Sequence, residues 1–194
     1  MSLTLALKPT LIDQVVPKSL STDIALVVGG AALTAVAAQI SIPTQPVPFT
    51  FQTLSVLLVG TVLGSLRGAL SMVVYLLAGL ALPVFADGAS GFTALFGATG
   101  GYLFGFVLAA AAIGFLGETV FSKNVFGMFS SFVVGSAIIY GLGVTVLAGT
   151  VFGWDFAKAA EVGVYPFLVW DALKAVIAAG LVPGTWKLVE LIKR

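Results

Sequence analysis

The chain has no cysteine and no histidine among its 194 residues, and it has few charged residues. Without cysteine there are no disulfides or thiolate metal sites. Without histidine there are no imidazole ligands, and Ser-His-Asp and Cys-His nucleophile systems are excluded. Charged side chains make up only 9% of the chain and hydrophobic ones 59%, whereas soluble domains carry about 25% charged residues. The composition therefore excludes a soluble globular domain.

Two further absences narrow the function. The net charge is only +1 and no basic patch occurs, so phosphate-backbone binding and a nucleic-acid partner are not expected. The glycine-rich run at 97–102, GATGGY, lacks the Lys-Ser/Thr ending of a P-loop, so nucleotide hydrolysis is not encoded there. The sequence thus predicts no metal, no cofactor and no catalysis.

Long apolar segments dominate what is present. They cover residues 23–42, 49–66, 68–85, 97–116, 125–151 and 166–189. Each holds roughly the 17–25 residues that a helix needs to cross a ~30 Å hydrocarbon core. The runs are continuous and do not alternate, which favours helices over a β-barrel. We therefore predict an all-α membrane protein with six transmembrane helices, embedded in lipid as a multi-pass protein of a prokaryotic plasma membrane.

The basic residues predict the orientation of this bundle. Six spans place both termini on one side, and the same side then receives Lys8, Lys18, Arg67, Lys123, Lys187, Lys193 and Arg194. Only Lys158 falls opposite, so the positive-inside rule makes both termini cytoplasmic. The expected organisation is a cytoplasmic N-terminal segment at 1–22, a transmembrane substrate-binding domain at 23–190 and a cytoplasmic tail at 191–194.

The outward connections are unusual for loops at a membrane surface. They read SIPTQPVPF at 41–49, ADGASGFTALFGATGG at 86–101 and FGWDFAKAAEVGVY at 152–165. A polar loop needs no phenylalanine or tryptophan, yet both occur among these three connections, together with glycine and proline. Such segments can fold back as lids over a pocket, and we expect the first one and the 91–102 region to form its lid and wall.

Asp171 and Lys174 stand out because they lie inside an apolar segment, PFLVWDALKAVIAAGLV. Their spacing puts both side chains on one helix face. A charge at mid-bilayer costs at least roughly 2.5–3.5 kcal/mol, so it usually has a partner or a ligand. One interpretation is a structural ion pair. The other is the polar floor of a pocket, in which the carboxylate accepts ligand N–H groups and the ammonium faces a ligand carboxylate or orients Asp171.

Further candidates are polar or backbone groups in apolar surroundings. Gln52 and Tyr140 need hydrogen-bond partners if they are buried, and the glycine-rich run opens a helix whose free N–H groups could meet a ligand. The predicted binding residues are Asp171, Lys174, Gln52, Tyr140, Gly91, Phe92, Thr99, Gly100, Gly101 and Tyr102. Small residues also recur every four positions, at Gly60, Gly64 and Gly68 and at Gly101 and Gly105, which predicts close helix packing.

A small-residue face on the first segment has two interpretations. Ala31 and Ala35 lie four residues apart, so they can pack against another helix of this chain or dock a separate membrane protein. The residues alone leave this choice open.

Four blocks in order, PVPFTFQTL, LGSLRGALSMVVYLLAGLALPVFA, GATGGYLFGF and PFLVWDALKA, resemble the BioY family over roughly residues 24–180. The resemblance implies six helices and a biotin site near the outer face, with no ATPase chemistry of the chain's own. It also implies an energy-coupling-factor (ECF) complex with a transmembrane coupling protein and two ATPases. By this likeness Ala31 and Ala35 dock the partner, while Asp171 and Lys174 line the site.

The chain departs from the family pattern at two places. The last motif commonly reads P-G-D where this chain has Val169, Trp170 and Asp171, and the third of these blocks often has proline in place of Ala98. Three other functions stay open from the sequence: a stand-alone secondary carrier in which Asp171 titrates, a component for another vitamin, and a membrane enzyme.

Overall fold

The computed structural model describes residues 10–119 and 124–192. In chain order the elements are η1 (Ile12–Gln14), α1 (Leu20–Gln39), β1 (Ser41–Ile42), β2 (Phe49–Thr50), α2 (Gln52–Leu63), α3 (Ser65–Ala81), η2 (Ala86–Gly88), α4 (Gly91–Leu95), α5 (Gly100–Gly117), α6 (Val125–Val151), α7 (Phe156–Gly163) and α8 (Tyr165–Ile192). The predicted all-α class is confirmed, because the only strands in the described ranges form one two-residue antiparallel pair.

Five helices are long and apolar enough to cross a membrane: α1, α3 with the residues after it, α5, α6 and α8. Helix α2 is apolar but has only 12 residues, which span about 18 Å. The count of six crossings and the cytoplasmic side of both termini therefore stay predictions. Four of the basic residues on which the predicted orientation depends lie outside the described residues: Lys8, Lys123, Lys193 and Arg194. The end of the predicted cytoplasmic tail also lies outside them.

The second predicted segment, 49–66, is wrong at both ends. Its first residues pair in a hairpin instead, with Ser41 opposite Thr50 and Ile42 opposite Phe49, and three prolines in the connection block a helix there. At the other end Gly64 has φ 89°, a conformation open to glycine. This corner also leaves no space, because a Cβ at Gly64 would lie 2.6 Å from Cγ2 of Thr10.

The remaining segments differ by no more than four residues at either end. Helix α1 begins at the Ser19 cap, whose hydroxyl accepts the Thr22 amide, rather than at residue 23. Helix α3 begins at Ser65, three residues before the predicted 68, and ends at Ala81. Helix α6 has the predicted bounds, 125–151, because the Asn124 side chain caps it through the Gly127 amide at 2.6 Å. Two predicted loops contain the short helices α4 and α7.

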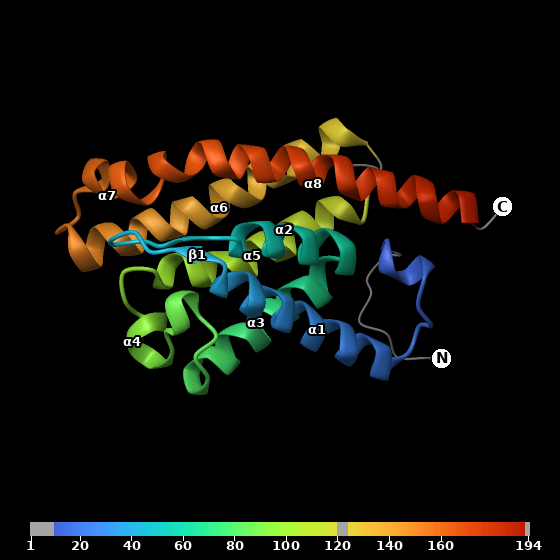
Figure 1. Cartoon of the computed structure of the whole chain (residues 1–194), viewed down its shortest axis with the longest axis horizontal. Coiled ribbons are helices and arrows are strands. Elements are labelled where there is room, and N and C mark those ends of the chain that lie inside the picture. The colour runs from blue at the N-terminus through green and yellow to red at the C-terminus, as the bar shows by residue number, and fades with distance from the viewer. Residues whose placement is uncertain (1–9, 120–123, 193–194) are drawn as a thin grey trace.

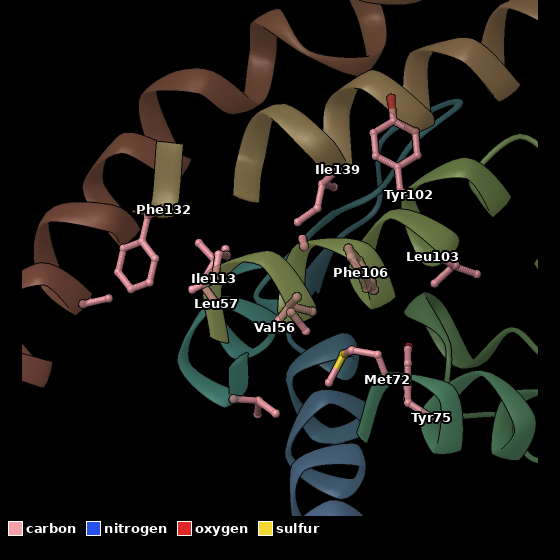
Figure 2. Packing of buried hydrophobic residues seen from close by; sticks show 14 of the residues in the cluster. Val56, Leu57, Met72, Tyr75, Tyr102, Leu103, Phe106, Ile113, Phe132 and Ile139 are labelled. Atoms are coloured by element: carbon pink, nitrogen blue, oxygen red, sulfur yellow. The ribbon is translucent and has the colours of Figure 1, made fainter. Parts of the chain in front are cut away.

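Helix α5 lies at the centre of the bundle, packed against α2, α3 and α6. Phe106 and Ile113 of α5 are buried among side chains from these neighbours (Figure 2). A Cβ at Gly60 would lie 2.7 Å from the Ala110 carbonyl oxygen, and one at Gly105 would lie 3.0 Å from Cα of Ile139. The small residues thus allow close backbone approach between these helices, as the spacing predicts.

The two ends of the bundle are built differently. The hairpin, α4 and α7 gather at the left-hand end in Figure 1, whereas α1 begins and α8 ends at the right-hand end. The elements at the left-hand end come from the connections that the sequence predicts to face outward. This end therefore carries the irregular backbone that can enclose a ligand.

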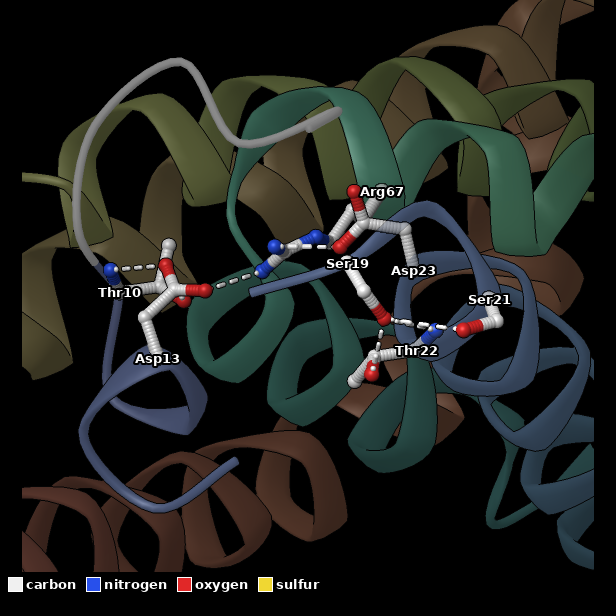
Figure 3. Close-up of polar contacts among 7 residues, drawn as sticks. All are labelled: Thr10, Asp13, Ser19, Ser21, Thr22, Asp23 and Arg67. Atoms are coloured by element: carbon white, nitrogen blue, oxygen red, sulfur yellow. Dashed lines mark hydrogen bonds and ion pairs between the residues drawn. The ribbon is translucent and has the colours of Figure 1, made fainter. Parts of the chain in front are cut away.

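A buried charge cluster lies at the opposite end (Figure 3). Arg67, predicted in a connection, lies in the first turn of α3 and is 1% exposed. Its guanidinium contacts the carboxylates of Asp13 at 2.9 Å and Asp23 at 2.5 Å. Burial raises the pKa of the Asp13 carboxyl, but hydrogen bonds from Thr10 and Arg67 outweigh it, so the net pKa lies below 3.8. The cluster joins the N-terminal segment to α1 and α3.

The predicted docking face of α1 points into the bundle. Ala31 is 6% exposed and belongs to the hydrophobic core, and Ala35 packs partly buried against that core. Of the two interpretations of this face, intramolecular packing is the one this structure shows. The outward side of α1 carries Ala25, Gly29 and Ala32 instead, which are exposed.

Candidate functional site

A cavity of about 280 Å³ opens at the end of the bundle that holds the hairpin. The hairpin and its loop, the start of α2, the η2 loop, α4, α5, α6, α7 and α8 all contribute to its walls. The lining residues are Val47, Pro48, Thr50, Gln52, Thr53, Phe85, Ala86, Asp87, Ala89, Ala94, Thr99, Tyr102, Leu103, Phe106, Ile139, Tyr140, Gly163, Phe167, Asp171 and Lys174. The walls are mainly apolar, with the polar groups concentrated near α8.

Asp171 and Lys174 form a direct ion pair in this cavity. The ammonium Nζ of Lys174 lies 2.8 Å from Oδ1 of Asp171. Both residues are buried, with Lys174 5% exposed and Asp171 8% exposed. The i, i+3 spacing on α8 brings them together, as the sequence predicts. A buried pair of this kind needs further hydrogen bonds to offset the loss of solvation.

Three other residues supply those hydrogen bonds. Nζ of Lys174 also donates to the Thr50 carbonyl at 2.8 Å and to the Thr53 hydroxyl at 3.0 Å. The Thr53 hydroxyl donates to Oδ1 of Asp171 at 3.1 Å, and Tyr140 donates to Oδ2 at 2.6 Å. The pair on α8 is thereby fixed to β2, α2 and α6.

Aromatic rings surround the ammonium. Nζ of Lys174 lies 4.3 Å from the ring centre of Phe49 and 5.5 Å from that of Phe51, distances suited to cation–π attraction. Phe49 in turn stacks on Phe167 with ring centres 6.0 Å apart and meets Trp170 edge-on at 5.9 Å. Trp170, the departure from the family motif, therefore packs against the hairpin and is not among the lining residues.

Gln52 connects the cavity to the η2 loop. Its side-chain carbonyl accepts the Thr50 hydroxyl at 2.9 Å, and its amide donates to Tyr75 at 2.7 Å. The Tyr75 hydroxyl donates onward to the Val84 carbonyl at 3.2 Å. On the far side, Tyr102 of α5 donates to the Gly163 carbonyl of α7 at 2.9 Å (Figure 2 shows both tyrosines). These bonds hold two connecting segments against the bundle.

The BioY family profile matches residues 9–191 of the chain. The chain belongs to the BioY family. Among curated relatives, the biotin transporter BioY of Thermotoga maritima is 47% identical over 149 residues, which cover 76% of this chain and 86% of that protein. A probable biotin transporter BioY of Lysinibacillus sphaericus is 51% identical over 87 residues, 44% of each chain.

A solved structure shares the fold of this BioY-family chain. The crystal structure of the S-component for biotin from an ECF-type ABC transporter superposes with a TM-score of 0.77 at 22% identity, covering 86% of this chain and 92% of that one. Together with the apolar helices, family membership makes the chain a multi-pass protein of the cell membrane.

The structure brings six of the ten predicted binding residues to this cavity: Asp171, Lys174, Gln52, Tyr140, Thr99 and Tyr102. The other four, Gly91, Phe92, Gly100 and Gly101, are not among its lining residues. The Phe92 ring is 67% exposed and stacks on Phe96, while Gly100 and Gly101 are buried against backbone of neighbouring segments. Ligand contact by any of the ten stays a prediction.

Sequence reasoning missed several groups of this site. Thr50 and Thr53 flank Gln52 in the block PFTFQTL, but threonine is too common in apolar helices to indicate a site. Phe49 was placed inside a helix, which hid its contact with Lys174. In the described part of the chain no group of three or more His, Cys, Asp or Glu side chains could hold a metal ion.

Proposed function

We propose that this BioY-family chain binds biotin in the 280 Å³ cavity and is the substrate-binding membrane component of a biotin uptake system. The observation that carries the proposal is the Asp171 carboxylate, held in place by Lys174, Thr53 and Tyr140 inside an apolar chamber. The names of the relatives and of the solved structure support biotin as the ligand.

The chemistry of biotin suits this chamber. Its ureido ring offers N–H donors, for which a buried carboxylate is a strong acceptor. Its thioether ring and alkyl tail are apolar and match the walls formed by Phe85, Phe106 and Phe167. The cavity lies near the lower end of the roughly 300–1,000 Å³ range of small-molecule pockets, as expected for a small vitamin.

Binding without chemical change is the expected outcome. Asp171, Lys174, Thr53 and Tyr140 already bond to one another, and they provide acceptors and donors without an activated nucleophile. We therefore place the chain among transport components, with biotin released unaltered.

Biotin titration by calorimetry on detergent-purified protein tests the proposal. Wild-type protein should bind tightly. Asp171→Asn and Lys174→Ala should each weaken binding at least about 100-fold, because each leaves a buried charge unpaired. Thr145→Val is the matched control, since this exposed α6 hydroxyl bonds only to the Gly141 carbonyl among the described residues and should leave affinity unchanged.

A wild-type protein that ignores biotin while binding thiamine or riboflavin would reassign the ligand. Uptake into proteoliposomes driven by a pH gradient, with no ATPase present, would instead support a stand-alone carrier.

We further propose that energy for uptake comes from an ECF coupling protein and its ATPase pair docked on α1. We place this docking surface at the exposed residues Ala25 and Gly29 instead of the predicted Ala31 and Ala35. Ala31 is buried in the core, whereas a Cβ at Gly29 would meet nothing within 4 Å. Small residues on an exposed membrane helix permit close approach of a partner helix.

Gly29→Leu should abolish co-purification of the coupling complex from cells that express all components, while biotin binding by the isolated chain persists. Gly141→Leu is the matched control, because Gly141 of α6 is equally open, with nothing within 4 Å of its Cβ position. A complex that survives Gly29→Leu and is lost with Gly141→Leu would place the docking surface on α6.

A further inference from the structure

We propose that Thr53 is the positioning residue of the ligand site: its hydroxyl fixes the Asp171–Lys174 pair so that one acceptor position of the carboxylate is left for a ligand N–H group. This inference rests on the proposed biotin function and concerns the same cavity. Thr53 lines the cavity from the first turn of α2 and is the one residue that hydrogen-bonds both members of the pair in the described part of the chain.

The hydrogen bonds of Lys174 show why this role is needed. An ammonium carries three N–H donors, and here they reach the Thr50 carbonyl, the Thr53 hydroxyl and Asp171. All three donors are therefore used within the chain. Lys174 consequently acts on a ligand through Asp171 and does not itself donate to a ligand carboxylate.

The hydrogen bonds that Asp171 accepts are divided unequally between its two carboxylate oxygens. Oδ1 accepts from Lys174 at 2.8 Å and from Thr53 at 3.1 Å, whereas Oδ2 accepts from Tyr140 at 2.6 Å. A carboxylate has about four acceptor positions, so the described contacts fill three and leave one on Oδ2. The ligand acceptor is thus Oδ2, because Thr53 and Lys174 occupy Oδ1.

The single hydrogen of the Thr53 hydroxyl sets the direction of this arrangement. It points to Asp171, so the hydroxyl oxygen can only accept from Lys174, and the three groups close a ring of hydrogen bonds. Without the hydroxyl, one Lys174 N–H loses its acceptor and Oδ1 regains a vacant position. The carboxylate can then turn either oxygen to the ligand, and a preorganised acceptor becomes a mobile one.

Thr53→Val removes the hydroxyl and keeps the shape. We expect biotin to bind about 30-fold more weakly, in line with the loss of hydrogen bonds to charged groups, and Thr53→Ser to restore most of the affinity. Thr61→Val is the matched control on the same helix, since the buried Thr61 hydroxyl donates to the Leu57 carbonyl of α2. It should bind biotin like the wild type.

Two biotin analogues, each methylated on a different ureido nitrogen, separate a positioning role of Thr53 from a purely structural one. If Thr53 prepares Oδ2 for one ureido N–H group, wild-type protein loses affinity for the analogue in which that group is methylated. Thr53→Val should then add little further loss of affinity for this analogue. Equal losses for biotin and for the analogues methylated at either nitrogen would overturn the inference, as would affinity within threefold of wild type in Thr53→Val.

Both outcomes are distinct from failure of the proposed function, in which wild-type protein does not bind biotin at all. If Thr53→Val is not recovered folded, Thr53→Cys serves in its place, because a thiol is a weak donor and acceptor of similar size. It should show the same selective loss for biotin over the methylated analogue, and a Cys variant with full affinity for biotin would overturn the inference.

Discussion

Two buried charge clusters lie at opposite ends of the bundle, and their difference separates function from architecture. Both place a cation at 5% exposure or less beside carboxylates. Asp171 and Lys174 line a cavity and leave an acceptor position unfilled. Arg67 instead joins Asp13 and Asp23, and none of these three lines the 280 Å³ cavity. A buried charge in a membrane helix therefore indicates a site only when space adjoins it.

The largest effect is expected when both members of the Asp171–Lys174 pair are removed. In Asp171→Leu/Lys174→Met no charge remains unpaired, so the unfolding free energy should fall far less than the about 3–5 kcal/mol lost when one partner of a buried pair is removed. Biotin affinity should fall at least about 1,000-fold, or roughly 4 kcal/mol. Calorimetry and unfolding in mixed micelles measure the two quantities. Binding that survives this double substitution would contradict the site.

The Arg67 cluster should respond in the opposite way. Arg67→Met leaves two buried carboxylates without their cation, and the unfolding free energy should fall by about 3–5 kcal/mol. Biotin affinity of the folded fraction should not change. Lys187→Met provides the control, because Lys187 is exposed and surface substitutions usually shift stability by less than about 0.5 kcal/mol. Loss of binding by folded Arg67→Met would make the Arg67 cluster part of the site.

A smaller effect is expected at Tyr140. Tyr140→Phe removes the donor to Oδ2 of Asp171, and biotin affinity should weaken about 10-fold, which corresponds to the lower end of the about 1.5–3 kcal/mol that a hydrogen bond to a charged group contributes. Tyr165→Phe, at an exposed ring, should have no effect in the same titration. Equal changes in the two variants would show that the phenol hydroxyl of Tyr140 does not support the carboxylate.

The smallest effect is a pH dependence of stability that arises from the Arg67 cluster alone. Because the pKa of Asp13 is held below 3.8 in the folded chain, its stabilisation is complete above that value and is lost as pH falls through the lowered pKa. Unfolding curves between pH 3 and 6 should show a decline at the acid end that is reduced in Asp13→Asn. If the unfolding free energy of Asp13→Asn falls at low pH as steeply as that of the wild type, the loss of stability comes from other carboxyl groups.

The boundaries of a helix could be predicted from the sequence where local residues determine them, and not where contacts distant in the chain do. The bounds of α6 were predictable because a continuous apolar run follows a capping asparagine, Asn124. The α2–α3 corner was not, because hydropathy carries no information on the positive φ of Gly64. Arg67 was misplaced for a related reason, since a charge next to an apolar run looks like a connection unless its partners, here Asp13 and Asp23, are known.

The residues of the site also fall into those that could be predicted from the sequence and those that could not. Asp171 and Lys174 were predictable because charges are rare in apolar segments, and Gln52 and Tyr140 because buried polar groups need partners. Thr53 was not, because its importance lies in two contacts with residues more than a hundred positions away. Gly91 and Phe92 were chosen for the character of their loop, and that loop reaches the cavity through Ala94 and the η2 residues instead.

The bond from Lys174 to the carbonyl of Thr50 has an evolutionary consequence. Its acceptor belongs to the backbone, so no side-chain replacement at position 50 deletes it. The hydrogen bond between the hairpin and α8 is thus inherited through one codon, that of Lys174, while Phe49 adds ring contacts with Phe167 and Trp170. A substitution at position 50 can then change the chamber wall that Thr50 lines without removing this backbone anchor.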